Sequence, residues 1–177
     1  MNKSKIHYKN KMAIYELSYF MKDYIDKDSV IICIGTDRCI GDSLGPLVGT
    51  ILQHRFFPLP VYGSVSSPIH AINLCERISN IKGMHPHSNI LAIDACLGEK
   101  NSIGEIHVRD YPIHPGKGVG KNLPDVGDTS IIGIIDSNDG GDIFLNKNIR
   151  LSFIMDMAEI IAESLFYSIY LKNLYHD

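Results

Sequence analysis

Short apolar segments rich in β-branched residues recur along this chain, and they restrict its fold more than any other feature. Two of them, residues 29–34 (SVIICI) and 89–94 (NILAID), are almost wholly apolar, which is typical of strands buried on both faces of a sheet. Further strand signals lie at residues 61–65, 104–109 and 129–136, and helical periodicity is found at residues 12–26, 44–57, 69–82 and 151–169. This alternation predicts an α/β fold: a three-layer sandwich with helices on both faces of a mostly parallel twisted sheet.

The length and charge of the chain restrict the kinds of function it can have. It has 177 residues, with 17 Lys and Arg against 20 Asp and Glu, so the formal net charge is −3. This length suits one domain, and we expect residues 12–177 to form it after a solvated leader at residues 1–11. A near-neutral balance offers no basic stripe for a phosphate backbone, so we expect no nucleic-acid partner and favour a small molecule or a polypeptide.

Apolar runs and cysteines indicate the compartment. No apolar run approaches the roughly 20 residues that span a bilayer, and no continuous apolar signal core follows the Lys-rich start. We therefore expect no membrane association and a cytoplasmic location. The cysteines lack the close spacing of a structural zinc site, so reduced thiols are expected. A homodimer is the expected assembly, because two-fold dimers are the commonest oligomers of soluble proteins.

Acidic residues follow the two apolar strand segments. In a doubly wound sheet, ligands bind beyond the carboxyl ends of the strands, where the strand order reverses. If the order begins 2-1-3, the two strands are neighbours at that point, and residues 35–42 (GTDRCIGD) face residues 94–98 (DACLG). Asp37 and Asp42 then lie on one side of a cleft and Asp94 on the other.

Two carboxylates in one cleft can share a proton, because like charges close together raise the pKa of one of them. One acid can then polarise a carbonyl while the other activates water, so Asp42 and Asp94 are predicted catalytic residues for peptide or amide hydrolysis without a cofactor. With the imidazole of His114, the same oxygens could instead hold a divalent metal ion. Each acid also has a purely structural interpretation. Asp94 could cap a turn. Asp42 could be the N-cap or a first-turn acid of the helix at residues 44–57, for which Ser43 is another candidate N-cap.

Residues 110–128 (DYPIHPGKGVGKNLPDVGD) form a long segment without a periodic apolar pattern, and such loops are usually functional or disordered. We expect a substrate loop here, with substrate-binding candidates His114, Gly116, Gly118 and Lys121 joined by Asp37 of the earlier loop. The GKGVGK run fits neither glycine motif for phosphate binding, so no nucleotide site is predicted.

Cys96, two residues beyond Asp94, is a conceivable nucleophile. A thiolate nucleophile needs a paired histidine, and spacing identifies none. A buried, inert cysteine is therefore the favoured interpretation.

Five ungapped segments, taken in order, carry a resemblance to a known family. They are IGTDRCIGDSLGPLVG (34–49), SPIHAINL (67–74), NILAIDACLG (89–98), HPGKGVGKNLPDVGD (114–128) and IIGIIDS (131–137). Together they resemble the YyaC family of sporulation proteins, a family of proposed spore proteases, over most of residues 29–165. That family is similar in turn to the germination protease, which degrades small acid-soluble spore proteins, and more distantly to the hydrogenase maturation proteases.

The resemblance implies a phosphorylase/hydrolase-like α/β fold and a peptidase of the sporulation and germination programme, acting on polypeptides such as small spore proteins inside the sporulating cell or spore. In the germination protease the two aspartates proposed for catalysis lie in a D-x-L-G-P-L and an I-D-A segment. These match Asp42 (DSLGPL) and Asp94 (IDA). In the hydrogenase maturation proteases two acids and a later histidine bind nickel, which makes His114 a candidate third ligand.

Two other functions remain open at this point. One is a metal-dependent endopeptidase of the maturation type. The other is a non-catalytic sporulation protein that binds a partner on a protease-like fold, since a fold does not by itself imply a function.

Overall fold

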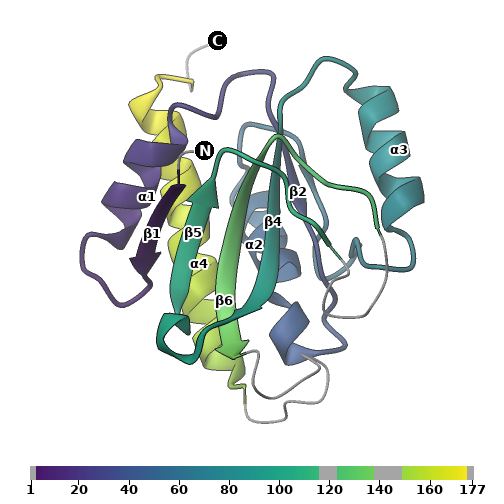
Figure 1. Cartoon of the computed structure of the whole chain (residues 1–177). Helices are drawn as coiled ribbons and strands as arrows, with labels where there is room; N and C mark the ends of the chain where they lie inside the picture. Colours follow the sequence, from purple (N-terminus) through teal and green to yellow (C-terminus); the bar gives the residue numbers. More distant parts are fainter. Residues whose placement is uncertain (1–2, 116–122, 138–148, 175–177) are drawn as a thin grey trace.

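A six-stranded mixed sheet, in the order β1-β5-β6-β4-β2-β3, forms the centre of the computed structural model of this protein (Figure 1). The structure describes residues 3–115, 123–137 and 149–174. The strands are β1 (Lys3–His7), β2 (Val30–Cys33), β3 (Val61–Tyr62), β4 (Ile90–Gly98), β5 (Glu105–Arg109) and β6 (Thr129–Ser137). The α-helices of the described residues are α1 (Ala13–Met21), α2 (Leu44–His54), α3 (Leu74–Met84) and α4 (Leu151–Leu171).

The strand directions agree with the predicted fold class. β3, β2, β4 and β6 are parallel neighbours, whereas β5 and β1 are added in antiparallel fashion at one side. β2 lies between β3 and β4, which is the 2-1-3 order assumed for the start of the sheet. The chain therefore moves from β2 to β3 on one side of β2, and then crosses over to β4 on the other side. This reversal between β2 and β4 is the predicted switch point.

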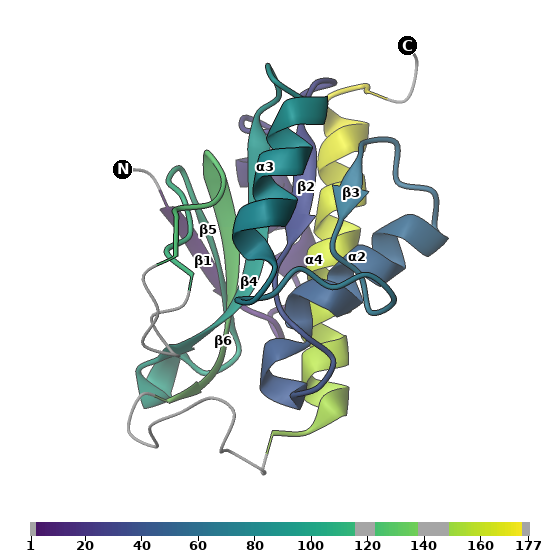
Figure 2. The same cartoon turned by 90° about the vertical axis from the view of Figure 1, so that its right-hand side faces the viewer.

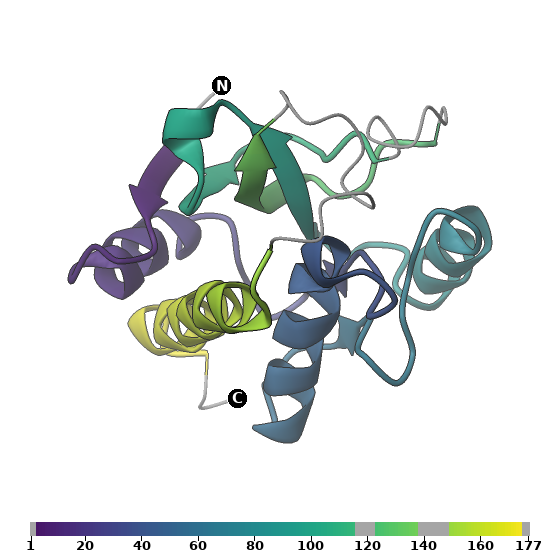
Figure 3. The same ribbon diagram turned by 90° about the horizontal axis from the view of Figure 1, so that it is seen from below.

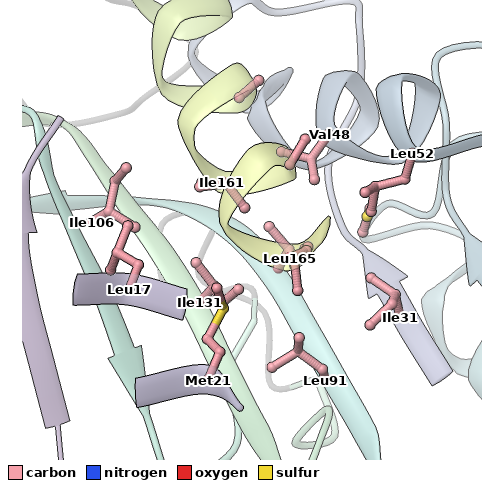
Figure 4. Packing of buried hydrophobic residues seen from close by; sticks show 14 of the residues in the cluster. Leu17, Met21, Ile31, Val48, Leu52, Leu91, Ile106, Ile131, Ile161 and Leu165 are labelled. Carbon is pink, nitrogen blue, oxygen red and sulfur yellow. The ribbon is translucent and has the colours of Figure 1, made fainter. Parts of the chain in front are cut away.

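Helices cover both faces of the sheet, as expected for a three-layer sandwich. Helices α1, α2 and α4 lie on one face and α3 on the other (Figures 2 and 3). Figure 4 shows side chains of the three-helix face converging on the sheet: Leu17, Met21, Ile31, Val48, Leu52, Leu91, Ile106, Ile131, Ile161 and Leu165. On the α3 face, Ile113 and Val126 pair in an isolated bridge and join the core, so the described part of the 110–128 segment also covers the sheet.

The expected solvated leader is wrong for residues 3–7, which form the edge strand β1. Ile6 is buried in the larger core cluster, and the backbone pairs with β5 from His7↔Glu105 to Lys3↔Arg109. Lysines on the solvent side of a sheet edge discourage pairing with other chains. They also leave this strand without the apolar pattern by which a strand is recognised in a sequence. Within the described residues, no helix is long and apolar enough to cross a membrane.

Several elements differ in length from the prediction, and two of these differences bear on the site. The helix expected at residues 69–82 begins only at Leu74, because Ile69 forms a bridge with Ile34 and the following residues make a turn in which Asn73 accepts the N–H of His70. The strand expected to end at Asp94 continues to Gly98. Asp94 therefore lies inside β4, at the level where β2 ends.

Candidate active site: an acid pair beside the end of β2

The loop that carries Asp42 folds back tightly onto the end of β2. The backbone N–H of Thr36 donates to the Asp42 carbonyl oxygen at 2.9 Å, which closes the loop. Gly35 has a φ of +135°, and a Cβ placed there would lie 2.1 Å from the same carbonyl oxygen. Only glycine accommodates both the backbone conformation and this close approach. A glycine directly after β2 therefore returns Asp42 to the mouth of the sheet.

The DSLGPL segment fixes Asp42 from the other side, because it seats the first turn of α2 on the sheet. A Cβ at Gly45 would lie 2.1 Å from the Ile34 carbonyl oxygen, so helix and strand backbones are in direct contact there. A Cβ at Gly133 would lie 2.3 Å from the Leu44 side chain, so Gly133 makes room for that leucine. Ser43 is the N-cap residue of α2, as predicted, but its hydroxyl donates to the Ile40 carbonyl oxygen at 2.7 Å and makes no capping hydrogen bond to the helix.

Asp94 reaches the same place from β4. Its residue pairs with Ile132 of β6, and its carboxylate accepts the backbone N–H of Ala95 at 2.8 Å. The neighbouring strand ends one position earlier, since the register of β2 and β4 runs only to Cys33↔Ile93. Asp94 is half-buried, as is Asp42.

The two carboxyl groups are electrostatically coupled, and we call them the acid pair. Burial raises the pKa of Asp42 to about 7, against a smaller opposing effect of the Thr36 backbone N–H. Burial also raises the pKa of Asp94 well above its ordinary value, and the charge of Asp42 adds to this increase. The fold thus brings together two acids about fifty positions apart in the chain, and at neutral pH one can hold a proton while the other is partly ionised.

The other predicted site residues are not joined to the acid pair. Asp37 is exposed on the loop of Asp42. His114 is exposed, and its Nδ1 hydrogen-bonds to Asp125 of its own loop. The candidates Gly116, Gly118 and Lys121 lie outside the described residues. Across the described ranges, no three His, Cys, Asp or Glu side chains are arranged to hold a metal ion, so the grouping of His114 with the acid pair is not formed there.

The cysteines near the site differ in chemical character. Cys33 is fully buried at the end of β2, and burial raises the pKa of its thiol far above the usual range, which makes it inert. Cys96 is half-buried, and its thiol donates to the Leu97 carbonyl oxygen at 3.1 Å. The sequence analysis did not single out Gly35 and Gly45 as the residues that place Asp42, although a glycine directly after a buried strand is a recognisable signal for a sharp turn.

Two comparisons place the chain among known proteins. A protein-family model described as "Protein of unknown function (DUF1256)" matches residues 5–164. A Bacillus subtilis (strain 168) protein named "Uncharacterized protein YyaC" is 43% identical over 150 residues, which cover 84% of this chain and 73% of the relative. The matched region includes β2, the loop of Asp42 and the whole of β4. The chain therefore belongs to the DUF1256 family, which agrees with the YyaC resemblance of its sequence.

Proposed function

We propose that this protein is a peptidase of the sporulation and germination programme, and that it hydrolyses peptide bonds with Asp42 and Asp94. The observation that carries the proposal is the coupling of two half-buried carboxyl groups at the switch point of the sheet, with the pKa of each above its ordinary value. Support also comes from the resemblance of the DSLGPL and IDA segments to the two aspartate segments of the germination protease. The sporulation context rests on that resemblance alone.

Both members of the acid pair have raised pKa values, and the mechanism gives them different roles. Asp94, whose pKa is raised well above its ordinary value by burial and by the charge of Asp42, acts in its protonated form, and its carboxyl group donates a proton to the carbonyl oxygen of the scissile peptide bond. Asp42, with a pKa of about 7, is partly ionised and takes a proton from the attacking water. The water oxygen bonds to the carbonyl carbon and the C–N bond breaks. Asp42 then gives its proton to the leaving amine, and the oxygen returns its proton to Asp94.

The test is cleavage of a small acid-soluble spore protein by the unmodified protein and by the variants Asp42→Asn and Asp94→Asn. Asparagine keeps the size of the side chain and cannot exchange the proton, so we expect kcat/KM to fall by about a thousandfold in each variant. The matched control is Asp156→Asn, which changes an exposed aspartate on α4 and should leave kcat/KM unchanged. Undiminished cleavage by both variants would show that the acid pair does not catalyse the reaction.

Chelation and binding measurements separate the two other candidate functions. We expect full activity after exhaustive chelation, because the coupled acids can activate water by themselves. Activity that is lost on chelation and restored by a divalent metal ion would favour the metal-dependent endopeptidase. No cleavage, together with partner binding that is unchanged when both aspartates are replaced, would favour the non-catalytic binding protein.

A further inference from the structure

Four tyrosines lie on the outer side of helices α1 and α4, outside both core clusters. Tyr15 and Tyr19 of α1 are 48% and 57% exposed, and Tyr167 and Tyr170 of α4 are 37% and 62% exposed. The ring centroids are 6.2 Å apart between Tyr15 and Tyr19, and 6.5 Å apart between Tyr15 and Tyr167. Those of Tyr167 and Tyr170 are 5.8 Å apart. Met12, which is 50% exposed one helical turn before Tyr15, extends this row of exposed side chains across two helices.

The end of α2 lies beside the same part of α4. Figure 3 shows α4 between α1 and α2. The Arg55 guanidinium forms an ion pair with Glu163 and lies 4.5 Å from the ring centroid of Phe166. Phe166 precedes Tyr170 by one turn of α4, so these two side chains are neighbours on its surface. Phe56 follows Arg55 and is 90% exposed, which continues the row of exposed rings to the end of α2.

Phe56 is held in a backbone conformation that is unfavourable for a bulky residue. Its φ is +55°, in the left-handed region where glycine usually ends a helix. The conformation is fixed because the Phe57 N–H donates to the Leu52 carbonyl oxygen at 2.9 Å, and the Phe57 ring is buried against Phe166. The Phe56 ring itself gains almost no burial that would offset this strain. A strained and exposed aromatic residue indicates a contact outside the single chain.

We propose that these exposed side chains form the interface with a second copy of this protein in a two-fold symmetric dimer. The inference goes beyond the proposed function and does not depend on it. We call the surface the aromatic face, and it consists of Met12, Tyr15, Tyr19, Phe56, Tyr167 and Tyr170.

The exposed area of the aromatic face suits a dimer. At their exposed fractions, the six side chains present about 700 Å², if a fully exposed side chain of this size contributes about 200 Å². This is more than the largest apolar patch of a typical monomer, which is about 300–600 Å². A second copy supplies the same area, so the pair would bury about 1,400 Å², within the range of about 1,200–2,000 Å² for specific interfaces.

The charges beside the aromatic face favour a second copy over a strongly charged partner. The Lys22 ammonium lies 4.4 Å from the ring centroid of Tyr19, and it forms an ion pair with Asp23 at 3.0 Å. Arg55, the cation beside Phe56, likewise pairs with an acid of its own chain. The cations that contact these rings are thus already neutralised, so they neither attract an anionic surface nor repel a copy of the same face. Tyrosine suits such an interface, because its hydroxyl group can be hydrated in the free monomer.

The order of the helices allows one pairing to satisfy both sides of the face. A two-fold axis parallel to α4 brings the end of α2 in one copy against α1 in the other, because α4 lies between these helices. Each Phe56 ring then contacts the α1 tyrosines of the other copy, and the same contact occurs twice. The strained ring is buried only in the dimer.

Sedimentation velocity over a range of micromolar concentrations tests the proposal, with the unmodified protein and with Phe56→Gly. We expect a reversible dimer, and we expect Phe56→Gly to raise its Kd by about tenfold or more. Glycine suits the left-handed backbone, so thermal unfolding of the dilute variant should occur at the same or a higher temperature. The matched control is Ile72→Ser, which removes an 82% exposed side chain just before α3 on the opposite face of the sheet and should leave the Kd unchanged.

Tyr170→Glu tests the centre of the face by a different change. Glutamate is a good helix former at an exposed position, so the fold should be kept, whereas two like charges at the interface should raise the Kd by about tenfold or more. Oxidative footprinting supplies the location: Tyr15, Tyr19 and Tyr170 should be protected at high protein concentration and become reactive on dilution.

Three results would overturn the inference. One is a protein that stays monomeric over the whole concentration range. Another is a dimer that forms equally well in Phe56→Gly and Tyr170→Glu, since it would use a different face. The third is a monomer whose tyrosines are protected only when vesicles of neutral and anionic phospholipids are added, which would assign the aromatic face to a membrane surface.

Discussion

The two halves of β4 differ in nearly every physical respect. Residues 90–93 pair with β2 on one side, residues 91–93 also pair with β6 on the other, and the side chains of all four are buried in the two cores. Among the described residues, 94–98 pair with β6 alone and are half-buried, and they carry Asp94 and Cys96. The first half is stabilised by the burial of its apolar side chains. In the second half, the polar side chains of Asp94 and Cys96 are partly shielded from water. One strand thus stabilises the fold at its start and carries the candidate chemistry at its end.

This difference shows how a parallel sheet can hold a carboxyl group whose partial burial destabilises the fold. A half-buried carboxyl group is destabilising when it is ionised, and the pKa values of the acid pair record this cost. The buried residues 90–93, packed between helices on both faces, supply the rigid support that the following residues need. Changes in the first half should therefore cost more stability than changes in the second half.

The largest expected effect on stability is in the first half. Ile93 is fully buried in the three-helix core cluster, so Ile93→Ala should lower the free energy of unfolding by about 4 kcal/mol, through lost burial and the cavity left behind. Leu97→Ala, in the half-buried second half, should cost about 1 kcal/mol. Urea denaturation at pH 7 measures both. Equal losses would mean that the two halves do not differ in packing.

The pH dependence of catalysis tests whether ionisation distinguishes the second half. Asp42 must be ionised to accept a proton, so kcat/KM should fall about tenfold per pH unit below about pH 7. Asp94 must be protonated, so kcat/KM should also fall as the rising pH ionises Asp94, and the two limbs of the profile belong to the pair. Initial rates from pH 4 to pH 10 provide the measurement. A rate that is independent of pH between 5 and 7 would contradict the role of Asp42.

The smallest expected effect is a gain in stability on removal of an acid. The unfolded Asp42 has a pKa of 3.8 and the folded one about 7, so the folded protein holds a proton that the unfolded chain releases between these values. Stability from this group is present below pH 3.8 and is lost as the pH rises to about 7. Asp42→Asn lacks this loss. At pH 8 it should therefore be more stable than the unmodified protein by about 2 kcal/mol, roughly half of what the full difference in pKa corresponds to, because solvent screens the half-buried side chain.

Thermal or urea unfolding at pH 4 and pH 8 checks this sign. The variant should show its advantage at pH 8 and lose most of it at pH 4, where Asp42 is protonated. Asp156→Asn again provides the comparison, because that aspartate is exposed. A destabilised Asp42→Asn protein at pH 8 would indicate that the carboxylate is stabilised in the fold and that its role as a tuned base is wrong.

Much of the fold could be predicted because its signals are local. The continuous apolar run of β2 indicates a strand buried on both faces. The helical period of the apolar residues in α4 indicates a helix buried on one face. β1 was missed because an edge strand is defined by its pairing with the distant β5, and its lysines resemble those of a solvated segment. The extension of β4 to Gly98 was missed for a related reason: Asp94 ends the apolar run, yet pairing with β6 continues.

For the site, strand order was the step that allowed prediction. A 2-1-3 order places the residues after β2 beside β4, so Asp42 and Asp94 could be paired without any distance information. His114 was not comparably constrained, because a loop has no register, and its hydrogen bond goes to Asp125. The three-residue metal grouping therefore depended on loop geometry that spacing does not encode.

By itself, the sequence determined the alternation of strands and helices and the identity of the two acids, because these follow from side-chain periodicity and residue type along short stretches. Only the tertiary structure decided that the acids share one desolvated environment and that β4 continues past the end of β2. Both features arise from contacts between segments far apart in the chain. Hydrogen-bond pairing and desolvation depend on which neighbours arrive in space, and no local pattern specifies them.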